Sequence, residues 1–324
     1  MEITNSPTPC RLDVVVPCYN EEEVLPISIP KLRDALETLR NEKLVSDDSQ
    51  ILFVDDGSID KTWERIEEAS NRFKDIVGLR LSQNVGHQNA LLAGLSHSKA
   101  DFTLSIDADL QDDLSVIPEM VKKGIDGHDV VFGIRSDRST DTAFKKNTAE
   151  LYYKLLSTIG VRVIQNHADF RLMRRDAVDR LLSYEEANLY LRGIVPLVGH
   201  NSSSVTYSRL ERAAGETKYP LKKMLGLAID GITSFSAVPL RMIAALGLFV
   251  FLIAFILALW VLWVRLVQDT AVPGWASTLL PTFFLGGIQL LSLGVIGEYV
   301  AKIYIESKGR PKYFVQTATD KDRR

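Results

Sequence analysis

The chain has 324 residues, of which 46% are hydrophobic and 24% are charged. This length allows one large domain or two medium ones, and the composition excludes a disordered or collagen-like chain. The 38 Lys and Arg residues against 41 Asp and Glu give a formal net charge of −3, so no basic field indicates binding to nucleic acid. Only two cysteines occur, Cys10 and Cys18, which suits a reducing compartment.

Short apolar, β-branched runs alternate with amphipathic stretches from Arg11 to about Arg209. The runs predict strands at 12–17, 51–55, 78–81, 102–107 and 129–133, and the stretches predict helices at 26–41, 61–73, 88–97 and 115–124. This alternation is typical of an α/β domain with a mainly parallel sheet and helices on both faces. Ligands bind such sheets at the carboxyl ends of the strands. Polar clusters follow three of the predicted strands at 18–23, 55–60 and 107–113, which predicts one shared crevice.

Two segments without a charged residue follow, Met242–Val264 and Trp275–Gly297, each 23 residues long. Each would form a helix of roughly 34 Å, enough to cross a bilayer core of about 30 Å. Buried core helices are the alternative, but those are usually shorter and keep a polar edge. We therefore expect two transmembrane helices.

Positive charge is concentrated on the outer flanks of these segments, at residues such as Lys222, Lys223 and Lys308, whereas the loop between them carries only Arg265 and Asp269. The positive-inside rule then predicts that both termini and the large N-terminal part are cytoplasmic, in a multi-pass protein of the inner (plasma) membrane. The polar residues 1–11 do not resemble a signal peptide.

The segment before the first span, Lys218–Ile229, carries lysines beside an apolar stripe. This pattern predicts an amphipathic helix at the membrane surface, with an ordinary solvated helix as the alternative. The expected organisation is an α/β domain at 1–211, a juxtamembrane segment at 212–240, a two-helix transmembrane domain at 241–300 and a basic cytoplasmic tail at 301–324.

Two carboxylates and an amide, Asp107, Asp109 and Gln111, follow an apolar strand. Carboxylates at i and i+2 on an ending strand can turn toward one point, and oxygen ligands of this kind suit Mg²⁺ or Mn²⁺ held with phosphate oxygens. An isolated Asp-x-Asp also occurs as a simple helix cap. The strand before it and the neighbouring clusters favour metal binding.

A second cluster, Asp55-Asp56-Gly57-Ser58-Ile59-Asp60, combines a strand end with a glycine turn. Gly57 permits close approach of a ligand, and Asp60 is a plausible N-cap. A turn and cap without a ligand would leave the adjacent Asp55–Asp56 pair unexplained. A carboxylate here could accept hydrogen bonds from a nucleobase.

Together these segments resemble the successive motifs of family 2 glycosyltransferases with the GT-A fold. The resemblance lies in 14–23, 54–62, 84–94 and 107–111. His167–Met173 is similar to the DFRL motif of the subgroup that acts on polyisoprenyl phosphates, and Arg212–Tyr219 is similar to its RxxGxSKY motif. Gly294–Tyr299 and Gly309–Pro311 match the two-span, dolichol-phosphate-mannose-synthase-like members.

The resemblance implies an inverting, metal-dependent transfer of a hexose from a nucleotide sugar to polyprenyl phosphate, in the modification of cell-envelope glycans. It implies roles for the following residues: Pro17, Tyr19, Glu21 and Asp55 in the nucleoside pocket; Asp107, Asp109 and Gln111 at the metal and nucleotide-sugar pyrophosphate; Arg135, Lys146 and Lys218 at the lipid phosphate; Asp169 and Arg212, with Asp109, at the reacting centre. Lys146 departs from the pattern, because a bidentate arginine is expected there. Thr217 replaces the usual serine but keeps the hydroxyl.

Several alternatives stay open. Glucose from UDP-glucose is the favoured donor, against mannose, N-acetylglucosamine or a modified arabinose. A processive polysaccharide synthase is disfavoured because a QxxRW motif and further spans are missing, whereas a catalytically inactive binding subunit would not need Asp107, Asp109 and Asp169. His87 and His167 are expected to be structural. The sequence leaves the oligomeric state, including a homo-oligomer, open.

Overall fold

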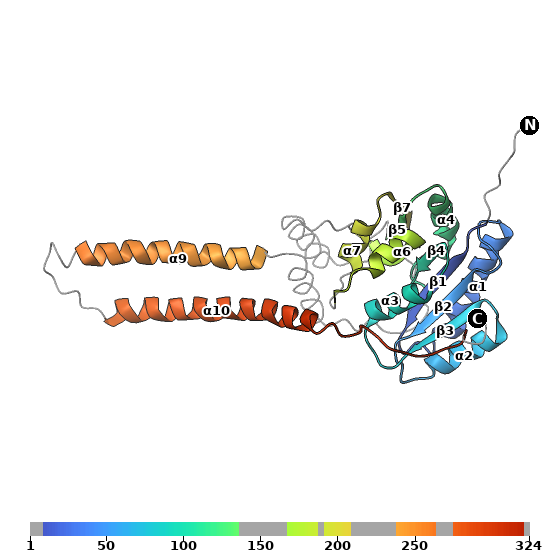
Figure 1. The fold of residues 1–324 in the computed structure, drawn as a ribbon, viewed down its shortest axis with the longest axis horizontal. Helices are drawn as coiled ribbons and strands as arrows, with labels where there is room; N and C mark the ends of the chain where they lie inside the picture. The colour runs from blue at the N-terminus through green and yellow to red at the C-terminus, as the bar shows by residue number, and fades with distance from the viewer. Residues whose placement is uncertain (1–8, 136–166, 187–190, 209–237, 264–274, 321–324) are drawn as a thin grey trace, which may run out of the picture. The chain divides into compact units, whose positions relative to one another are not determined.

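The computed structural model describes residues 9–135, 167–186, 191–208, 238–263 and 275–320. The chain divides into two compact units (Figure 1). An α/β unit comprises nearly all of Met1–Pro220 and also takes in Arg310–Arg324, and a helical unit comprises Leu221–Gly309. Lys146, Arg212 and Lys218, with most of the predicted juxtamembrane segment, lie outside the described residues.

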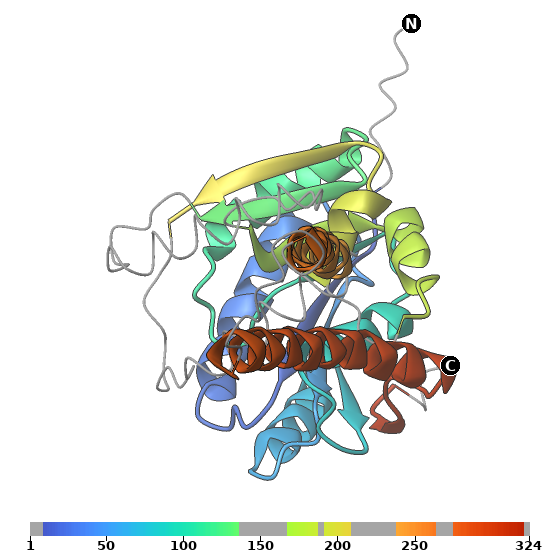
Figure 2. The same ribbon diagram turned by 90° about the vertical axis from the view of Figure 1, so that its left-hand side faces the viewer.

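The α/β unit is built on one eight-stranded sheet with the order β7-β5-β6-β4-β1-β2-β3-β8. All strands run in the same direction except β6 and β8, so the predicted mainly parallel sheet is confirmed. Figure 2 shows β7, in yellow, beside β5, in green, at one side of the sheet. The strands are β1 (Leu12–Cys18), β2 (Gln50–Asp55), β3 (Ile76–Leu81), β4 (Phe102–Ser105), β5 (Val130–Arg135), β6 (His167–Arg174), β7 (Ser202–Tyr207) and β8 (Val315–Ala318).

Helices cover both faces of this sheet. The helices of the unit are α1 (Leu25–Asn41), α2 (Thr62–Arg72), α3 (His87–His97), the short 3₁₀ helix η1 (Leu114–Val116), α4 (Ile117–Ile125), α6 (Arg175–Leu182) and α7 (Leu191–Val198). One core contains the apolar faces of α1, α2 and α4 together with alternate residues of β1 such as Val14 and Val16. Val15 points to the opposite face, because successive side chains of a strand alternate. There α3 approaches so closely that a Cβ on Gly94 would lie 2.4 Å from Val15 Cγ1.

The five strands and four helices predicted in the first 133 residues are all present, with ends that differ by at most two residues. The predicted helix at 115–124 is divided into η1 and α4. The additional elements are β6, α6, α7, β7 and β8. Of these, β6 lies between β4 and β5 and runs antiparallel to both.

The chain segment expected to be a basic tail contributes β8 to the sheet. β8 pairs antiparallel with β3, and Thr319 Oγ1 accepts hydrogen bonds from Gly78 N at 2.9 Å and from Ser70 Oγ at 2.8 Å. Asp320 Oδ2 lies 2.9 Å from His97 Nε2. Residues 301–307, also assigned to that tail, belong to a long helix. The composition of this segment indicates a charged tail, but it does not predict β8, which is only four residues long.

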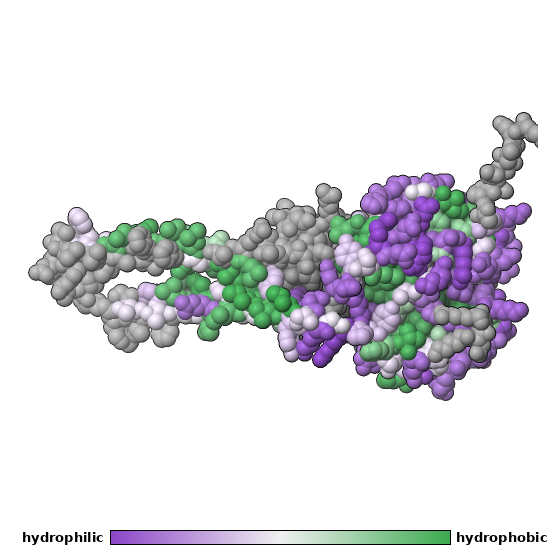
Figure 3. Space-filling model, in the orientation of Figure 1, coloured by the Kyte–Doolittle hydropathy of each residue, from purple (hydrophilic) through white to green (hydrophobic). Residues whose placement is uncertain are grey.

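The helical unit contains α9 (Val238–Trp263) and α10 (Trp275–Ser307). Figure 3 shows hydrophobic residues, in green, along both helices, whereas hydrophilic residues, in purple, predominate on the α/β unit. Among the described residues, one stretch, the 24 residues of Phe284–Ser307 in α10, is long and apolar enough to cross a bilayer by length and composition. Large apolar side chains of both helices are exposed, including Phe249, Ile256 and Leu290, which does not fit the alternative of buried core helices.

Candidate active site

The loops that follow β1 and β2 are joined by hydrogen bonds between side chains of one and backbone of the other. Asn20 N donates to Ser58 Oγ at 3.0 Å, and Ile59 N donates to Asn20 Oδ1 at 3.0 Å. Glu21 N donates to Thr62 Oγ1 at 2.7 Å. Asn20 has a positive φ of 56°, a conformation that asparagine adopts more readily than most residues. The two loops therefore form one fixed surface at the carboxyl edge of the sheet.

The residues expected at the nucleoside pocket all lie at this edge. Pro17 is buried in β1, Glu21 is partly buried, and Tyr19 is 45% exposed, so its ring is open to a ligand. Asp55 is fully buried: its Oδ1 accepts a hydrogen bond from Ser58 N at 3.0 Å, and its Oδ2 lies 3.4 Å from Arg80 Nε. Contacts of these residues with a nucleobase stay a prediction, and Asp55 has a structural role in the loop.

Asp56, next to Asp55, fixes the loop that leads into α3. Its two carboxylate oxygens accept hydrogen bonds from Val85 N at 2.8 Å and Gly86 N at 2.9 Å. Burial raises the pKa of Asp56, and the two backbone donors oppose this shift. Gly86 has a φ of 89°, which favours glycine. The consequence is a defined position for His87, the first residue of α3.

The metal-binding loop predicted at 107–111 begins directly after β4. Asp107 Oδ1 is buried and has no hydrogen-bond partner within the described residues. Burial raises the pKa of Asp107 to about 6, and the carboxylates of Asp169, Asp112 and Asp109 add to the shift. Asp109 Oδ1 accepts a hydrogen bond from Gln111 N at 3.3 Å. An orphaned carboxylate oxygen among other carboxylates fits a divalent cation, which would neutralise this charge.

A complete protein ligand set is not formed, however. Among the described residues, no group of three His, Cys, Asp or Glu side chains has the arrangement to hold a metal ion. Mg²⁺ in proteins commonly keeps one or two carboxylates and completes its shell with water and substrate phosphate. Asp107, Asp109 and the amide of Gln111 would be the protein part of such a shell.

Asp169 reaches the same edge because β6 is antiparallel. The first residues of β6 lie where β4 ends, and Ser105 Oγ donates to Asp169 O at 2.6 Å. Two arginines hold the carboxylate: Arg171 Nη2 lies 2.9 Å from Oδ1, and Arg192 Nη2 lies 3.2 Å from Oδ2. Burial acts to raise the pKa of Asp169, but Arg171, Arg192 and His87 outweigh it and hold this pKa well below its usual value. Asp169 is therefore ionised and a weak base.

His87 lies between the two carboxylates that the sequence singled out. Its Nε2 is 3.5 Å from Asp107 Oδ1 and 3.7 Å from Asp169 Oδ2, and its side chain is 43% exposed. The expectation of a purely structural His87 rested on the absence of a partner nearby in sequence. Asp107 follows β4 and Asp169 lies in β6, both apart from His87 in sequence, so this contact cannot be predicted from the sequence alone.

Two further residues of the site were not anticipated, Arg171 and Arg192. Arg171 is fully buried within the DFRL-like segment, and Arg192 is in α7, with 48% of its side chain exposed.

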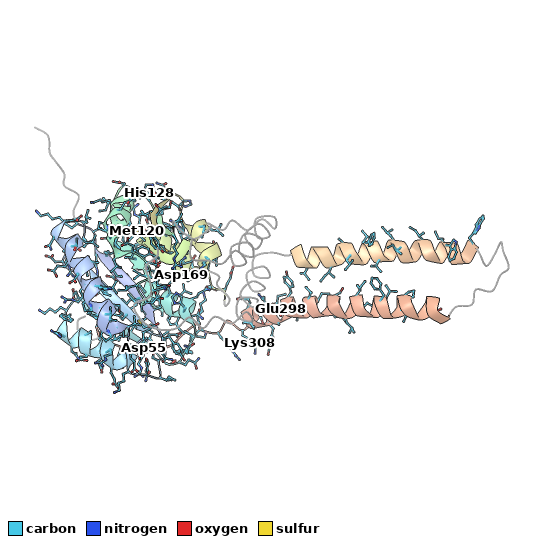
Figure 4. All side chains as sticks on the ribbon, turned by 180° about the vertical axis from the view of Figure 1, so that it is seen from behind. Asp55, Met120, His128, Asp169, Glu298 and Lys308 are labelled. Carbon is cyan, nitrogen blue, oxygen red and sulfur yellow. The ribbon has the colours of Figure 1, made fainter. Side chains whose placement is uncertain are left out.

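The candidate site extends across several strands. Figure 4 labels Asp169 and Asp55 in different parts of the α/β unit, and two strands, β1 and β4, separate β6 from β2 in the sheet. The site therefore spans the middle of the sheet.

Arg135, expected at the lipid phosphate, is the last residue of β5. Its Nη2 lies 3.0 Å from Asp112 Oδ1, and its Nε lies 3.2 Å from the hydroxyl of Tyr207. Tyr207 also donates a hydrogen bond to Asp112. Binding of phosphate by Arg135 stays a prediction.

Comparison with known proteins identifies relatives along nearly the whole chain. The model of the family "Glycosyl transferase family 2" matches residues 13–182. A Bacillus subtilis (strain 168) protein named "Uncharacterized glycosyltransferase YkoT" is 49% identical over 94% of this chain and 90% of its own length. The "Bactoprenol glucosyl transferase" of Shigella phage SfV is 41% identical over 96% of this chain and 100% of its own length.

A protein of Escherichia coli (strain K12) named "Prophage bactoprenol glucosyl transferase homolog" is 42% identical over 94% of this chain and 98% of its own. Among solved structures, glucosyl-3-phosphoglycerate synthase from Mycobacterium tuberculosis, in complex with Mn²⁺, UDP and phosphoglyceric acid, is 18% identical. That alignment covers 69% of this chain and 76% of the other, with a TM-score of 0.46.

Proposed function

Because the chain belongs to glycosyl transferase family 2, we propose that it transfers glucose from UDP-glucose to polyprenyl phosphate, with inversion at the anomeric carbon. The main observation that supports glycosyl transfer is that Asp107, His87 and Asp169 lie close together at one edge of the sheet. The choice of lipid and sugar is supported by the relatives named bactoprenol glucosyl transferase, which match over nearly their whole length.

Charge determines the mechanism that we propose. A Mg²⁺ or Mn²⁺ ion at Asp107, Asp109 and Gln111 would stabilise the negative charge that develops on the leaving nucleoside diphosphate. The acceptor is a phosphate monoester, whose second pKa is near 6, so its oxygen is largely anionic at neutral pH. The attack on the anomeric carbon therefore needs no strong general base.

Asp169 fits an orienting role in this reaction. Its pKa is held low by the arginine pair, so it gains a proton only with difficulty. With Arg171 and Arg192 in fixed positions it places positive charge beside the reacting centre. Arg212 would add charge stabilisation there, and Arg135, Lys146 and Lys218 would receive the acceptor phosphate.

A membrane location suits this acceptor, because a long prenyl chain is costly to remove from a bilayer. We propose that α9 and α10 both span the plasma membrane and that the α/β unit and both termini are cytoplasmic. The apolar stretch in α10 and the exposed apolar side chains of both helices support this arrangement.

The test is transfer by the purified full chain in detergent, with polyprenyl phosphate, a divalent metal and radiolabelled sugar nucleotides. We expect lipid-linked label with UDP-glucose and loss of that label when metal is removed by a chelator. Label with a mannose, N-acetylglucosamine or arabinose donor instead would correct the sugar. Failure to label lipid with any of these donors would overturn the proposed reaction, and metal-dependent nucleotide binding without transfer would indicate an inactive binding subunit.

A further inference from the structure

Asp112 is a buried carboxylate that the proposed reaction does not use directly. It is 1% exposed and follows Gln111 in the chain. Burial of an ionised carboxylate is costly unless partners compensate for the lost water. Here the compensation comes from Arg135 and from the hydroxyl of Tyr207, both of which lie on other elements.

Strand pairing brings Arg135 and Tyr207 together. They are direct partners in the parallel pairing of β5 with β7, each at the last residue of its strand. The ring of Tyr207 packs edge-on against Phe170, with centroids 5.5 Å apart. Gly133 leaves the room for this packing, because a Cβ there would lie 2.6 Å from Phe170 Cδ1 and 3.0 Å from Tyr207 Cε1. The hydroxyl of Tyr207 is thus held in a fixed place.

The guanidinium of Arg135 is held along one edge. Its Nε and Nη2 face Asp112 and Tyr207, and within the described residues its Nη1 meets no acceptor. The Arg135 side chain is 26% exposed. A free arginine side chain samples many rotamers, and a planar guanidinium that is fixed along one edge keeps its other N–H groups oriented for binding a phosphate.

We propose that Asp112 and Tyr207 are positioning residues that hold Arg135 in the orientation that binds the phosphate of the acceptor lipid. This inference rests on the proposed function. It assigns to Asp112 a task on the acceptor side, although Asp112 is adjacent to the metal-binding residue Gln111.

The test measures KM for polyprenyl phosphate, KM for the nucleotide sugar and the Kd of UDP with Mn²⁺, in the full chain in detergent. The main variant is Tyr207→Phe, which keeps the buried ring and removes only the hydroxyl. We expect KM for polyprenyl phosphate to rise about fivefold in Tyr207→Phe and about tenfold or more in Asp112→Asn. KM for the nucleotide sugar and the Kd of UDP should stay within about twofold.

The matched control is Asp129→Asn, which weakens another carboxylate–arginine pair of the same unit, with Arg180 at 3.1 Å. It should leave both KM values unchanged. In an Arg135→Ala background, Tyr207→Phe should have no further effect on KM for the acceptor. Thermal unfolding of each variant identifies loss of fold.

Three outcomes would overturn the inference while leaving the proposed function intact. The first is an unchanged KM for polyprenyl phosphate in a folded Tyr207→Phe variant, and the second is an effect of Tyr207→Phe on this KM that persists in the Arg135→Ala background. The third is a rise only in the KM for the nucleotide sugar and the Kd of UDP, which would assign Asp112 to the metal side of the site. A wild-type chain that transfers no sugar to polyprenyl phosphate would overturn both.

Discussion

The candidate active site lies at the carboxyl edge of the sheet, and the two halves of this edge are held by different kinds of interaction. In the β1–β2 half, backbone N–H groups donate to side-chain oxygens, as with Asn20, Thr62 and Asp56. In the β6–β5–β7 half, arginines pair with buried carboxylates, as with Arg171 and Asp169. The first arrangement fixes a backbone surface, which suits recognition of a nucleoside. The second keeps several cations in place beside carboxylates, which suits a phosphate acceptor.

The largest effect is expected from Asp107→Asn, at the boundary between these halves. It retains the size of the side chain but removes the charge that would hold the metal. We expect the transfer rate to fall by about 10²–10³-fold, measured as lipid-linked label at saturating metal. Asp126→Asn, on an exposed residue after α4, is the control and should keep full activity. Full activity in Asp107→Asn would remove the case for the metal-binding loop.

Arg171→Met tests the charge pairing of the β6–β5–β7 half. Removing one partner of a buried ion pair costs about 3–5 kcal/mol, because the other charge is left buried. We expect a loss of unfolding free energy of this size in urea, followed by circular dichroism. Arg192→Met is the matched comparison, since Arg192 binds the same carboxylate but is 48% exposed. Its cost should be below about 1 kcal/mol. A larger loss of unfolding free energy in Arg192→Met than in Arg171→Met would show that burial does not determine how much each ion pair contributes to stability.

Asp56→Asn tests the hydrogen bonds from backbone N–H groups to side-chain oxygens in the β1–β2 half. An asparagine offers one oxygen where Asp56 offers two, so either Val85 N or Gly86 N loses its acceptor. The expected cost is about 1–3 kcal/mol in unfolding free energy, with a raised KM for the nucleotide sugar because His87 is displaced. Asp34→Asn, on an exposed residue of α1, should change neither value. An unaffected donor KM in Asp56→Asn would mean that this loop does not serve the donor.

The smallest expected effect is a difference between the two halves in how the stability of the fold depends on pH. The pKa of Asp56 is raised in the folded chain, so its ionisation costs stability as the pH rises above about 4. The pKa of Asp169 is lowered, so its contribution is present above about pH 4 and is lost as the pH falls. Relative to wild type, Asp56→Asn should therefore gain in melting temperature as the pH rises from 4 to 7, whereas Asp169→Asn should lose as the pH rises toward 4 and stay level above it. Slopes of the same sign would contradict the assignment.

The β1–β2 half could be predicted from the sequence because its strands are apolar runs followed by polar turns. β6 was missed as a strand because Asp169 and Arg171, two residues apart in this strand, pair with each other and occupy positions where an apolar run would be expected. β7 contains three serines and lies at the edge of the sheet, so its apolar pattern is weak. The contact of His87 with Asp107 and Asp169 depends on strand order, which spacing along the chain does not encode.

The place of β8 in the sheet has a consequence for biosynthesis. Thr319 hydrogen-bonds to Gly78, which is 241 residues earlier in the chain. At about 5–20 residues per second, roughly 10–50 s separate the synthesis of these two residues. During that time the outer edge of β3 has no strand to pair with, and unpaired strand edges favour association with other chains. The α/β unit is therefore completed only after both helices of the helical unit have been translated, so its assembly and theirs are coupled in time.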